Sequence, residues 1–212
     1  YGLTFIALLA PGAAIAVNWA LGNYQPRPVN AVIHETGLWA IRILFVSLAI
    51  TPLRQMTGLS RLVAVRRMIG VTAFVYVLVH LLLYVLDESF HLQKVATEIL
   101  VRYYLLIGFV ALILLGVLAG TSTTKAIRNL GGAHWQNVHR LSYVAAVLAV
   151  AHHYMQSKVN VSEPVIMTGL LVWLFGYRVL ASNRRGPPVS LVRLAILSVF
   201  AALLAALGEA AY

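Results

Sequence analysis

The stretch that decides the fold reads VRRMIGVTAFVYVLVHLLLY, from Val65 to Tyr84. After Arg66 and Arg67 it has no further Lys, Arg, Asp or Glu. A helix needs about 20 mostly apolar residues to cross the hydrocarbon core of a bilayer, and this stretch has that length. It also holds His80 between apolar neighbours on both sides. The stretch therefore predicts a transmembrane helix with an imidazole inside it.

The rest of the chain has the same apolar character. Hydrophobic residues make up 61% and charged residues 10% of the 212 residues, and the mean hydropathy is +0.86. A soluble domain averages about 25% charged residues, so the composition indicates a membrane protein. We predict an all-α, polytopic transmembrane helix bundle with six core spans and a seventh C-terminal span. The expected spans are roughly 1–21, 36–53, 68–86, 100–119, 137–156, 164–181 and 190–208.

The charges predict how the spans are oriented. Lys and Arg gather in the segments 54–67, 120–136 and 182–189, and such clusters mark cytoplasmic loops. All six acids lie toward the other side; they are Glu35, Asp87, Glu88, Glu98, Glu163 and Glu209. We therefore expect the N terminus to be cytoplasmic. Because the first span lacks an initiator Met and a charged flank, we expect the sequence to begin inside its first helix and not at a cleavable signal peptide.

Composition also argues against several functions. The net charge is +10, but the basic residues flank spans, where they fix orientation and meet the headgroups of anionic membrane lipid. We therefore expect no nucleic-acid partner. The chain has no Cys, which excludes disulfides, thiolate metal sites and covalent haem attachment.

Two histidines stand out by their depth in the predicted spans. His80 lies about 10 Å and His152 about 9 Å from the outer ends of their helices, at 1.5 Å per residue. Imidazoles at one depth on different helices can supply both axial ligands of one haem iron, which suits electron transfer because no coordination position stays open. His34, His91 and His134 lie near span ends or in loops, where an interfacial role is the simpler interpretation.

The histidine doublet leaves an alternative open. His139 precedes His152 by 13 residues, which places it about 19 Å nearer the cytoplasmic side, and its partner is not obvious. In one unbroken helix, His139 and His153 would share a face, whereas His152 would lie about 100° away. Helical phase alone therefore favours His153 over His152 as the companion of His139.

Four segments resemble a known family. The chain is similar to MsrQ (formerly YedZ), the haem-binding membrane subunit of the bacterial methionine sulfoxide reductase system, in the ferric-reductase-like transmembrane superfamily. The resemblance covers residues 1–182 and depends on RRMIG with a His twelve residues on, and on W-x-x-x-H-R with a His thirteen residues later. The segments are Val65–Tyr84, His34–Arg54, Val101–Gly108 and Thr121–Tyr154. Residues 183–212 would then be a cytoplasmic turn and an additional hydrophobic helix.

The resemblance implies a cytochrome b of the bacterial inner membrane. Such a protein would pass electrons from the quinol pool or a flavin donor, such as a cytoplasmic flavin reductase, to the periplasmic molybdopterin protein MsrP, which repairs oxidised methionines. It implies one haem b or two, with His80 and His152 as iron ligands, while helical phase keeps His153 as the alternative to His152. His139 would bind a second haem or lie near the donor site. Family membership also implies flavin mononucleotide (FMN), which no residue here places.

Further residues are candidates for supporting roles. Arg66, Arg67 and Arg140 are candidates for binding haem propionates or an anionic donor, and orientation by charge alone is the alternative for each. The second ring nitrogens of the iron ligands should be oriented by carbonyls or hydroxyls, such as those of Ser142 or Tyr143.

Two other kinds of protein remain as alternatives. The chain is either a ferric-reductase-like electron carrier for another acceptor or a transporter that uses its histidines. A transporter would favour broken helices and buried ionisable groups other than His, but here Arg42 is the only charge well inside a span. One departure from the family is Arg102-Tyr103-Tyr104, where the usual motif has Pro in the middle.

Overall fold

The computed structural model describes residues 1–157, 161–182 and 189–210, which form helices and no strand. The long helices are α1 (Gly2–Ala20), α2 (Pro28–Thr57), α3 (Leu62–Asp87), α5 (Tyr103–Gly120), α8 (Leu141–Gln156), α9 (Ser162–Leu180) and α10 (Leu191–Ala210). The short ones are α4 (Leu92–Val101), α6 (Thr124–Leu130) and α7 (Gly132–His139). The predicted all-α helix bundle is confirmed.

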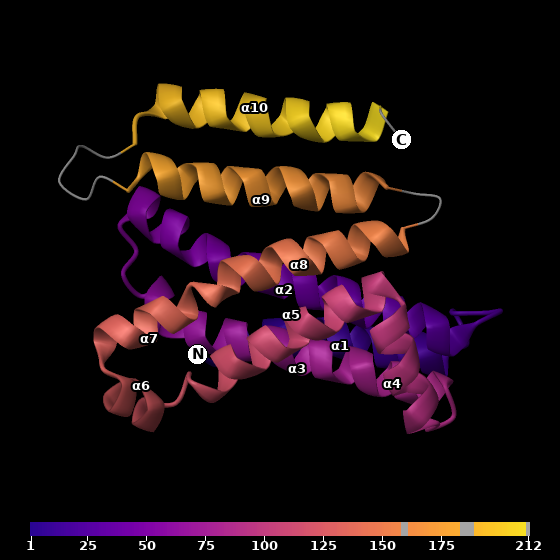
Figure 1. Ribbon diagram of the computed structural model, residues 1–212. Helices are drawn as coiled ribbons and strands as arrows, with labels where there is room; N and C mark the ends of the chain where they lie inside the picture. Colours follow the sequence, from indigo (N-terminus) through magenta and orange to yellow (C-terminus); the bar gives the residue numbers. More distant parts are fainter. Residues whose placement is uncertain (158–160, 183–188, 211–212) are drawn as a thin grey trace.

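Each of the seven predicted spans contains one long helix. Six of these are long and apolar enough to cross a membrane by themselves, and α8, with 16 residues, is shorter. Even so, α8 runs along the bundle beside α5 and α9, from the α7 end to the opposite end (Figure 1). The chain therefore passes along the bundle seven times within the described residues.

The bundle has two chemically different ends. The N terminus, α6 and α7 lie at one end, and α4 and the C-terminal end of α10 lie at the other (Figure 1). We call the first the basic end, which carries Arg54, Arg61, Arg66, Arg67, Lys125, Arg128 and Arg140. We call the second the acidic end, which carries Glu35, Asp87, Glu88, Glu98, Glu163 and Glu209. Residues 183–188 of the predicted loop 182–189 lie outside the described residues.

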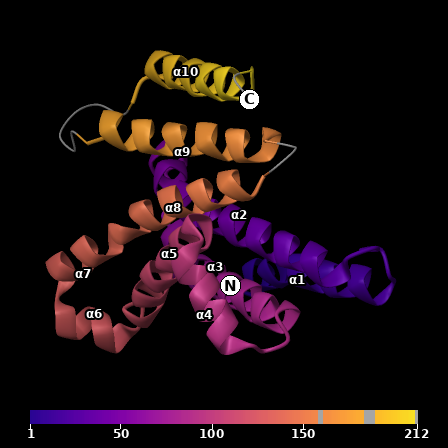
Figure 2. The ribbon, with the colours of Figure 1, turned by 45° about the vertical axis from the view of Figure 1, so that its right-hand side comes forward.

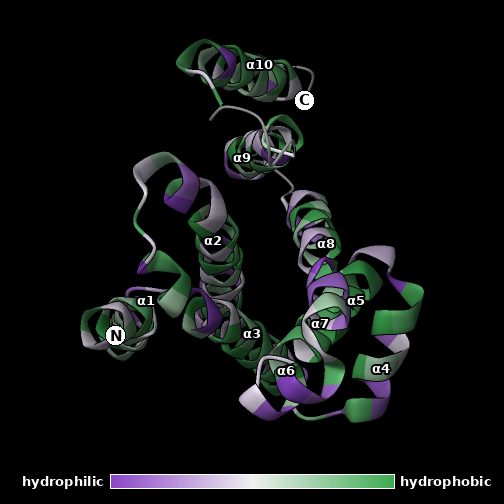
Figure 3. Ribbon diagram, turned by 90° about the vertical axis from the view of Figure 1, so that its left-hand side faces the viewer, coloured by the Kyte–Doolittle hydropathy of each residue, from purple (hydrophilic) through white to green (hydrophobic). Residues whose placement is uncertain are grey.

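Several helices pack around α2, which lies inside the bundle. Of the candidate spans, α2 is the most enclosed, with 56% of its most apolar stretch buried, because α1, α3, α8 and α9 all contact it. α10 packs on α9 and forms the outermost layer (Figure 2). The view along the bundle axis shows that most of the long helices are predominantly apolar, drawn in green (Figure 3). Their exposed apolar faces suit contact with lipid tails.

A side chain of α3 hydrogen-bonds to the backbone of α1 beside a proline. Pro11 has no N–H, which weakens the hydrogen bonding of the helix around it. The Tyr76 hydroxyl donates to the Leu8 carbonyl at 2.9 Å and accepts from the Gly12 N–H at 2.8 Å. Tyr76 thus binds both backbone groups of α1 beside the proline. This contact joins α1 to α3 inside the membrane.

In α2 a side chain replaces the donor that a proline lacks. Pro52 cannot donate to the carbonyl of Leu48, four residues earlier. The Arg178 guanidinium of α9 donates to that carbonyl at 2.8 Å and lies over the Tyr143 ring, 4.7 Å from its centroid. The structure shows a tertiary hydrogen bond from α9 to α2.

Two features differ from the sequence prediction. The segments that form α4, α6 and most of α7 were expected to be loops, because they are too short for a 20-residue window. The segment 137–156 was expected to be one helix, but α7 ends at His139 and α8 begins at Leu141. The doublet therefore lies on a different helix from His139.

Candidate functional site

His80 is held on α3 by two groups of α2. Its Nδ1 lies 2.8 Å from the backbone carbonyl oxygen of Ile33, and since a carbonyl only accepts, Nδ1 carries the proton. Its ring lies against Gly37, where a Cβ would come within 3.0 Å of Cε1 and Nδ1. The ring is thereby fixed with Nε2 deprotonated, which is the form of imidazole that binds a metal.

His152 of α8 is held by α5 in the same way. Its Nδ1 lies 2.7 Å from the Tyr104 carbonyl oxygen. A Cβ at Gly108 would lie 2.8 Å from that nitrogen and 2.9 Å from Cε1. In both helices the accepting carbonyl precedes the glycine by four residues, that is, by about one turn. Two helix pairs, α2 with α3 and α5 with α8, therefore present an imidazole by the same arrangement.

The two imidazoles face each other across the bundle. Their ring centroids are 6.3 Å apart and their planes meet at 86°. A metal–imidazole bond is about 2.0 Å long and the bonded nitrogen lies about 1.1 Å from the ring centroid, so two imidazoles sharing one ion have centroids about 6 Å apart. The observed separation fits such a pair.

The described residues form no cluster that could hold a bare metal ion by itself. They contain no group of three or more His, Asp or Glu side chains that could hold one. Two imidazoles alone leave most coordination positions of a metal unfilled. A haem supplies the other ligands from its macrocycle, so His80 and His152 fit an iron that needs only two axial ligands.

A cavity of about 780 Å³ surrounds the two imidazoles. α2, α3, α4, α5 and α8 all contribute to its wall, together with residues of the α1–α2 connection. Toward the basic end its lining is apolar, and toward the acidic end it includes the cations Arg27, Lys94 and Arg102. Arg66, Arg67 and Arg140 do not line it; they lie at the basic end. The cavity is large enough for a cofactor.

His153 takes a different position from His152. It also lines the cavity, but its Nε2 is buried and has no hydrogen-bond partner in the described part of the chain. The sequence-based argument for His153 assumed one helix through Arg140, and the break between α7 and α8 removes that assumption. The opposed rings are those of His80 and His152.

His139 lies away from the cavity, at the end of α7. Its ring stacks on Trp135 with 3.9 Å between centroids, and its Nε2 is 3.3 Å from the Thr121 hydroxyl oxygen. The Trp135 indole donates to the Thr121 carbonyl at 2.9 Å. Arg66 lies within electrostatic range of this imidazole. The structure therefore brings Arg66 near His139 and separates both from His80 and His152.

The hydroxyls expected to orient the imidazoles have other partners. The Ser142 hydroxyl donates to the His139 carbonyl at 2.8 Å, and Tyr143 lies under Arg178. The backbone carbonyls of Ile33 and Tyr104 orient the rings instead. Single carbonyls have no sequence signature, but the two glycines that face the histidines could have been noticed as small residues inside long apolar spans.

Comparison with known proteins identifies the family. The family described as "Ferric reductase like transmembrane component" matches residues 36–150. Three relatives are each described as "Protein-methionine-sulfoxide reductase heme-binding subunit MsrQ". The protein of Rhodospirillum rubrum is 39% identical over 85% of this chain and 88% of its own length. That of Caulobacter vibrioides is 38% identical, with 87% and 88% covered, and that of Xanthomonas oryzae pv. oryzae is 45% identical, with 83% and 84% covered.

No solved structure matches this chain. The family match contains His80 and His139, and the matches to the three relatives extend over more than four fifths of the chain. The expected resemblance is confirmed, and the protein is a membrane electron-transfer subunit by family. The chain belongs to the MsrQ family of haem-binding membrane subunits, within the ferric-reductase-like transmembrane proteins.

Proposed function

We propose that this protein is a cytochrome b of the bacterial inner membrane in which His80 and His152 bind one haem iron. The observation that carries the proposal is the pair of opposed imidazoles, 6.3 Å apart, on the wall of one cavity. When bound, the haem supplies a one-electron carrier, and two axial histidines leave it no open position for a substrate. Electron transfer is therefore its function.

The chain's own residues prepare the site for this role. The Ile33 and Tyr104 carbonyls hold the Nδ1 protons, which keeps Nε2 free and makes each imidazole a stronger ligand. Gly37 and Gly108 let the rings lie close to α2 and α5, so the ligands are fixed by packing. The apolar inner wall keeps water away from the macrocycle.

The relatives' printed names and the two ends of the bundle support a proposal for the acceptor. The relatives are subunits of a protein-methionine-sulfoxide reductase, which supports MsrP in the periplasm as the acceptor, at the acidic end. The basic end then faces the cytoplasm, with the N terminus, by the positive-inside rule. Quinol or a flavin reductase would be the donor, and the region of His139 with Arg66, Arg67 and Arg140 would accept a second haem or lie beside the donor. FMN has no assigned residues.

The histidine doublet supplies the test. Replacing His80 or His152 with Ala should abolish the low-spin haem spectrum, since an apolar pocket offers no other strong ligand. His153→Ala is the matched control and should keep it. His139→Ala should keep this haem and lose either a second one or electron input. The measurements are the dithionite-reduced spectrum and the pyridine haemochrome content per protein.

The opposite outcomes would point elsewhere. If His153→Ala lost the spectrum while His152→Ala kept it, the ligand assignment within the doublet would be wrong. A pure, colourless protein would instead favour the transporter alternative. A normal haem content without electron delivery to MsrP would favour a ferric-reductase-like carrier for another acceptor.

A further inference from the structure

The cavity around His80 and His152 is polar at one end only. Lining residues toward the basic end are all apolar: Ile41, Val77, Ala111, Leu112, Leu115 and Ala149. The lining at the acidic end carries three acids and three cations; the acids are Asp87, Glu88 and Glu98, and the cations are Arg27, Lys94 and Arg102. A haem has two carboxylates on one edge and apolar substituents on the others. An asymmetric cofactor in an asymmetric cavity has one favourable orientation.

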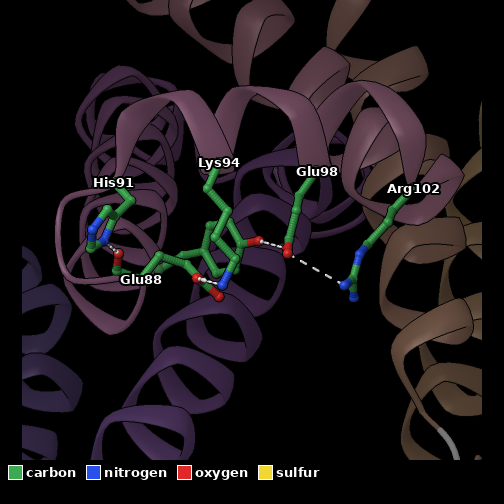
Figure 4. Close-up of polar contacts among 6 residues, drawn as sticks. Glu88, His91, Lys94, Glu98 and Arg102 are labelled. Atoms are coloured by element: carbon green, nitrogen blue, oxygen red, sulfur yellow. Dashed lines mark hydrogen bonds and ion pairs between the residues drawn. The ribbon is translucent and has the colours of Figure 1, made fainter.

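The cations at this mouth differ in what they already bind. Glu88 follows α3, Lys94 and Glu98 lie on α4, and Arg102 follows α4; their charges alternate along a row (Figure 4). The Lys94 ammonium is 2.5 Å from a Glu88 carboxylate oxygen, which raises the pKa of Lys94. Lys94 is therefore already neutralised by Glu88.

Arg102 and Arg27 keep more free donors. Arg102 reaches Glu98 only at 3.4 Å and donates to the Tyr104 hydroxyl at 3.0 Å. A guanidinium has five N–H groups, so several remain available. Glu98 is also bound by the Tyr84 hydroxyl at 2.6 Å and does not depend on Arg102. The Arg27 side chain makes no hydrogen bond or ion pair within the described ranges.

We infer that the mouth of this cavity is a dicarboxylate site in which Arg27 and Arg102 bind the two haem propionates. Arginine suits this task because its planar fork matches a carboxylate. The haem is then held with its polar edge toward the acidic end, where an outer acceptor would dock. The inference rests on the proposed function, and it assigns the propionates to other arginines than the basic-end set Arg66, Arg67 and Arg140.

The test compares two ligands that differ only in those carboxylates. Protein produced without haem is titrated in detergent with haemin and with haemin dimethyl ester, whose propionates are neutral. The signal is the low-spin absorbance that His80→Ala removes. Half-exposed ion pairs each change affinity by up to about fivefold, so native protein should prefer haemin by about tenfold.

The variants assign that preference to residues. In Arg27→Gln/Arg102→Gln the preference should fall toward one, and each single variant should lose part of it. Lys125→Gln/Arg128→Gln, at the basic end and away from the cavity, is the matched control and should keep the native preference.

The opposing results separate this inference from the proposed function. The inference is wrong if native protein binds both ligands equally, or if only Arg66→Gln/Arg67→Gln/Arg140→Gln removes the preference, with the low-spin signal intact in both cases. If native protein gives no low-spin signal, or His80→Ala keeps it, the proposed function itself fails. Since the ester is tested on unchanged protein, a variant that does not fold leaves the main comparison valid.

Discussion

At the scale of single residues, two glycines decide how closely the imidazoles approach their neighbouring helices. A Cβ would lie 2.8 Å from His152 Nδ1 at Gly108 and 3.0 Å from His80 Nδ1 at Gly37. Contacts below 3.0 Å are not tolerated without movement, so the ring must shift away from its carbonyl. These glycines are thus positioning residues for the proposed haem site.

We therefore predict that Gly108→Ala weakens haem binding more than Gly37→Ala does. Losing the hydrogen bond that orients a metal ligand costs about 10- to 100-fold in affinity. Gly120→Ala in the same helix is the control, because nothing lies within 4 Å of its added Cβ. Haem content per protein, measured after purification in detergent, should be lowest in Gly108→Ala, intermediate in Gly37→Ala and highest in Gly120→Ala. Equal haem content in Gly108→Ala and Gly120→Ala would contradict the close approach.

The sequence predicts the candidate histidines but not the backbone groups that orient them. It could single out His80 and His152 as candidate ligands, because the sequence itself shows an imidazole among apolar residues and its depth in a predicted span. It could not find the carbonyls of Ile33 and Tyr104, since every residue has a carbonyl and only packing selects one. For the same reason, it offered Ser142 and Tyr143 instead.

At the scale of helices, the proline inside α2 is compensated by a side chain from another helix. Leu48 loses its helical partner at Pro52 and accepts from Arg178. A buried carbonyl without a partner is costly in lipid, where no water can replace the donor. Arg178 thus contributes to stability as well as to orientation.

Arg178→Leu should lower the free energy of unfolding by about 1–3 kcal/mol, the cost of leaving a buried acceptor unpaired. Pro52→Ala restores the N–H that Leu48 lacks, so the double variant should recover part of the loss. Unfolding in mixed detergent, followed by circular dichroism, measures all four proteins. If the cost of Arg178→Leu is the same with Pro52 and with Ala at position 52, the contact with Tyr143 and not the carbonyl explains it.

Helices were predicted correctly where the run of apolar residues was long enough to cross a membrane. A run of about 20 apolar residues has no good alternative to a helix in a membrane, so every predicted span contains one. The short helices α4, α6 and α7 were missed because they lie at the ends of the bundle, where polar and apolar residues alternate without a clear boundary. The break at Arg140 was missed because it contains neither Gly nor Pro.

At the scale of the whole molecule, the chain leaves the bundle at the end opposite to where it begins. The N terminus lies at the basic end, and α10 ends at the acidic end (Figure 1). If the basic end is cytoplasmic, the C terminus is periplasmic.

A reporter fused after Tyr212 should therefore be active as alkaline phosphatase and dark as green fluorescent protein. Fusion after Ser182, which removes α10, should reverse both results, because α9 ends at the basic end. The two fusions control for each other in expression and insertion. Cytoplasmic activity at Tyr212 would mean that α10 does not span the membrane.

The acidic end should also attract the redox partner, and Asp87 offers a test if haem content is measured alongside, because Asp87 also lines the cavity. Glu88 and Glu163 are tied to Lys94 and Arg42, so reversing their charge would also disturb the fold. Asp87 is exposed. Asp87→Lys should slow electron delivery about threefold at low salt and hardly at high salt, because salt screens exposed charges. Lys125→Glu, at the other end, should not slow it. A rate that is constant across the salt series would argue against docking at this end.

The contact between Tyr76 and α1 has a consequence for biogenesis. The hydroxyl that binds Leu8 and Gly12 belongs to the third long helix, which leaves the ribosome well after the first. Until it arrives, α1 lacks these two hydrogen bonds to α3. The first helix is therefore completed late in synthesis, and a nascent chain that ends before Tyr76 should be extracted from the membrane, or cleaved by a membrane protease, more easily than one that extends past Asp87.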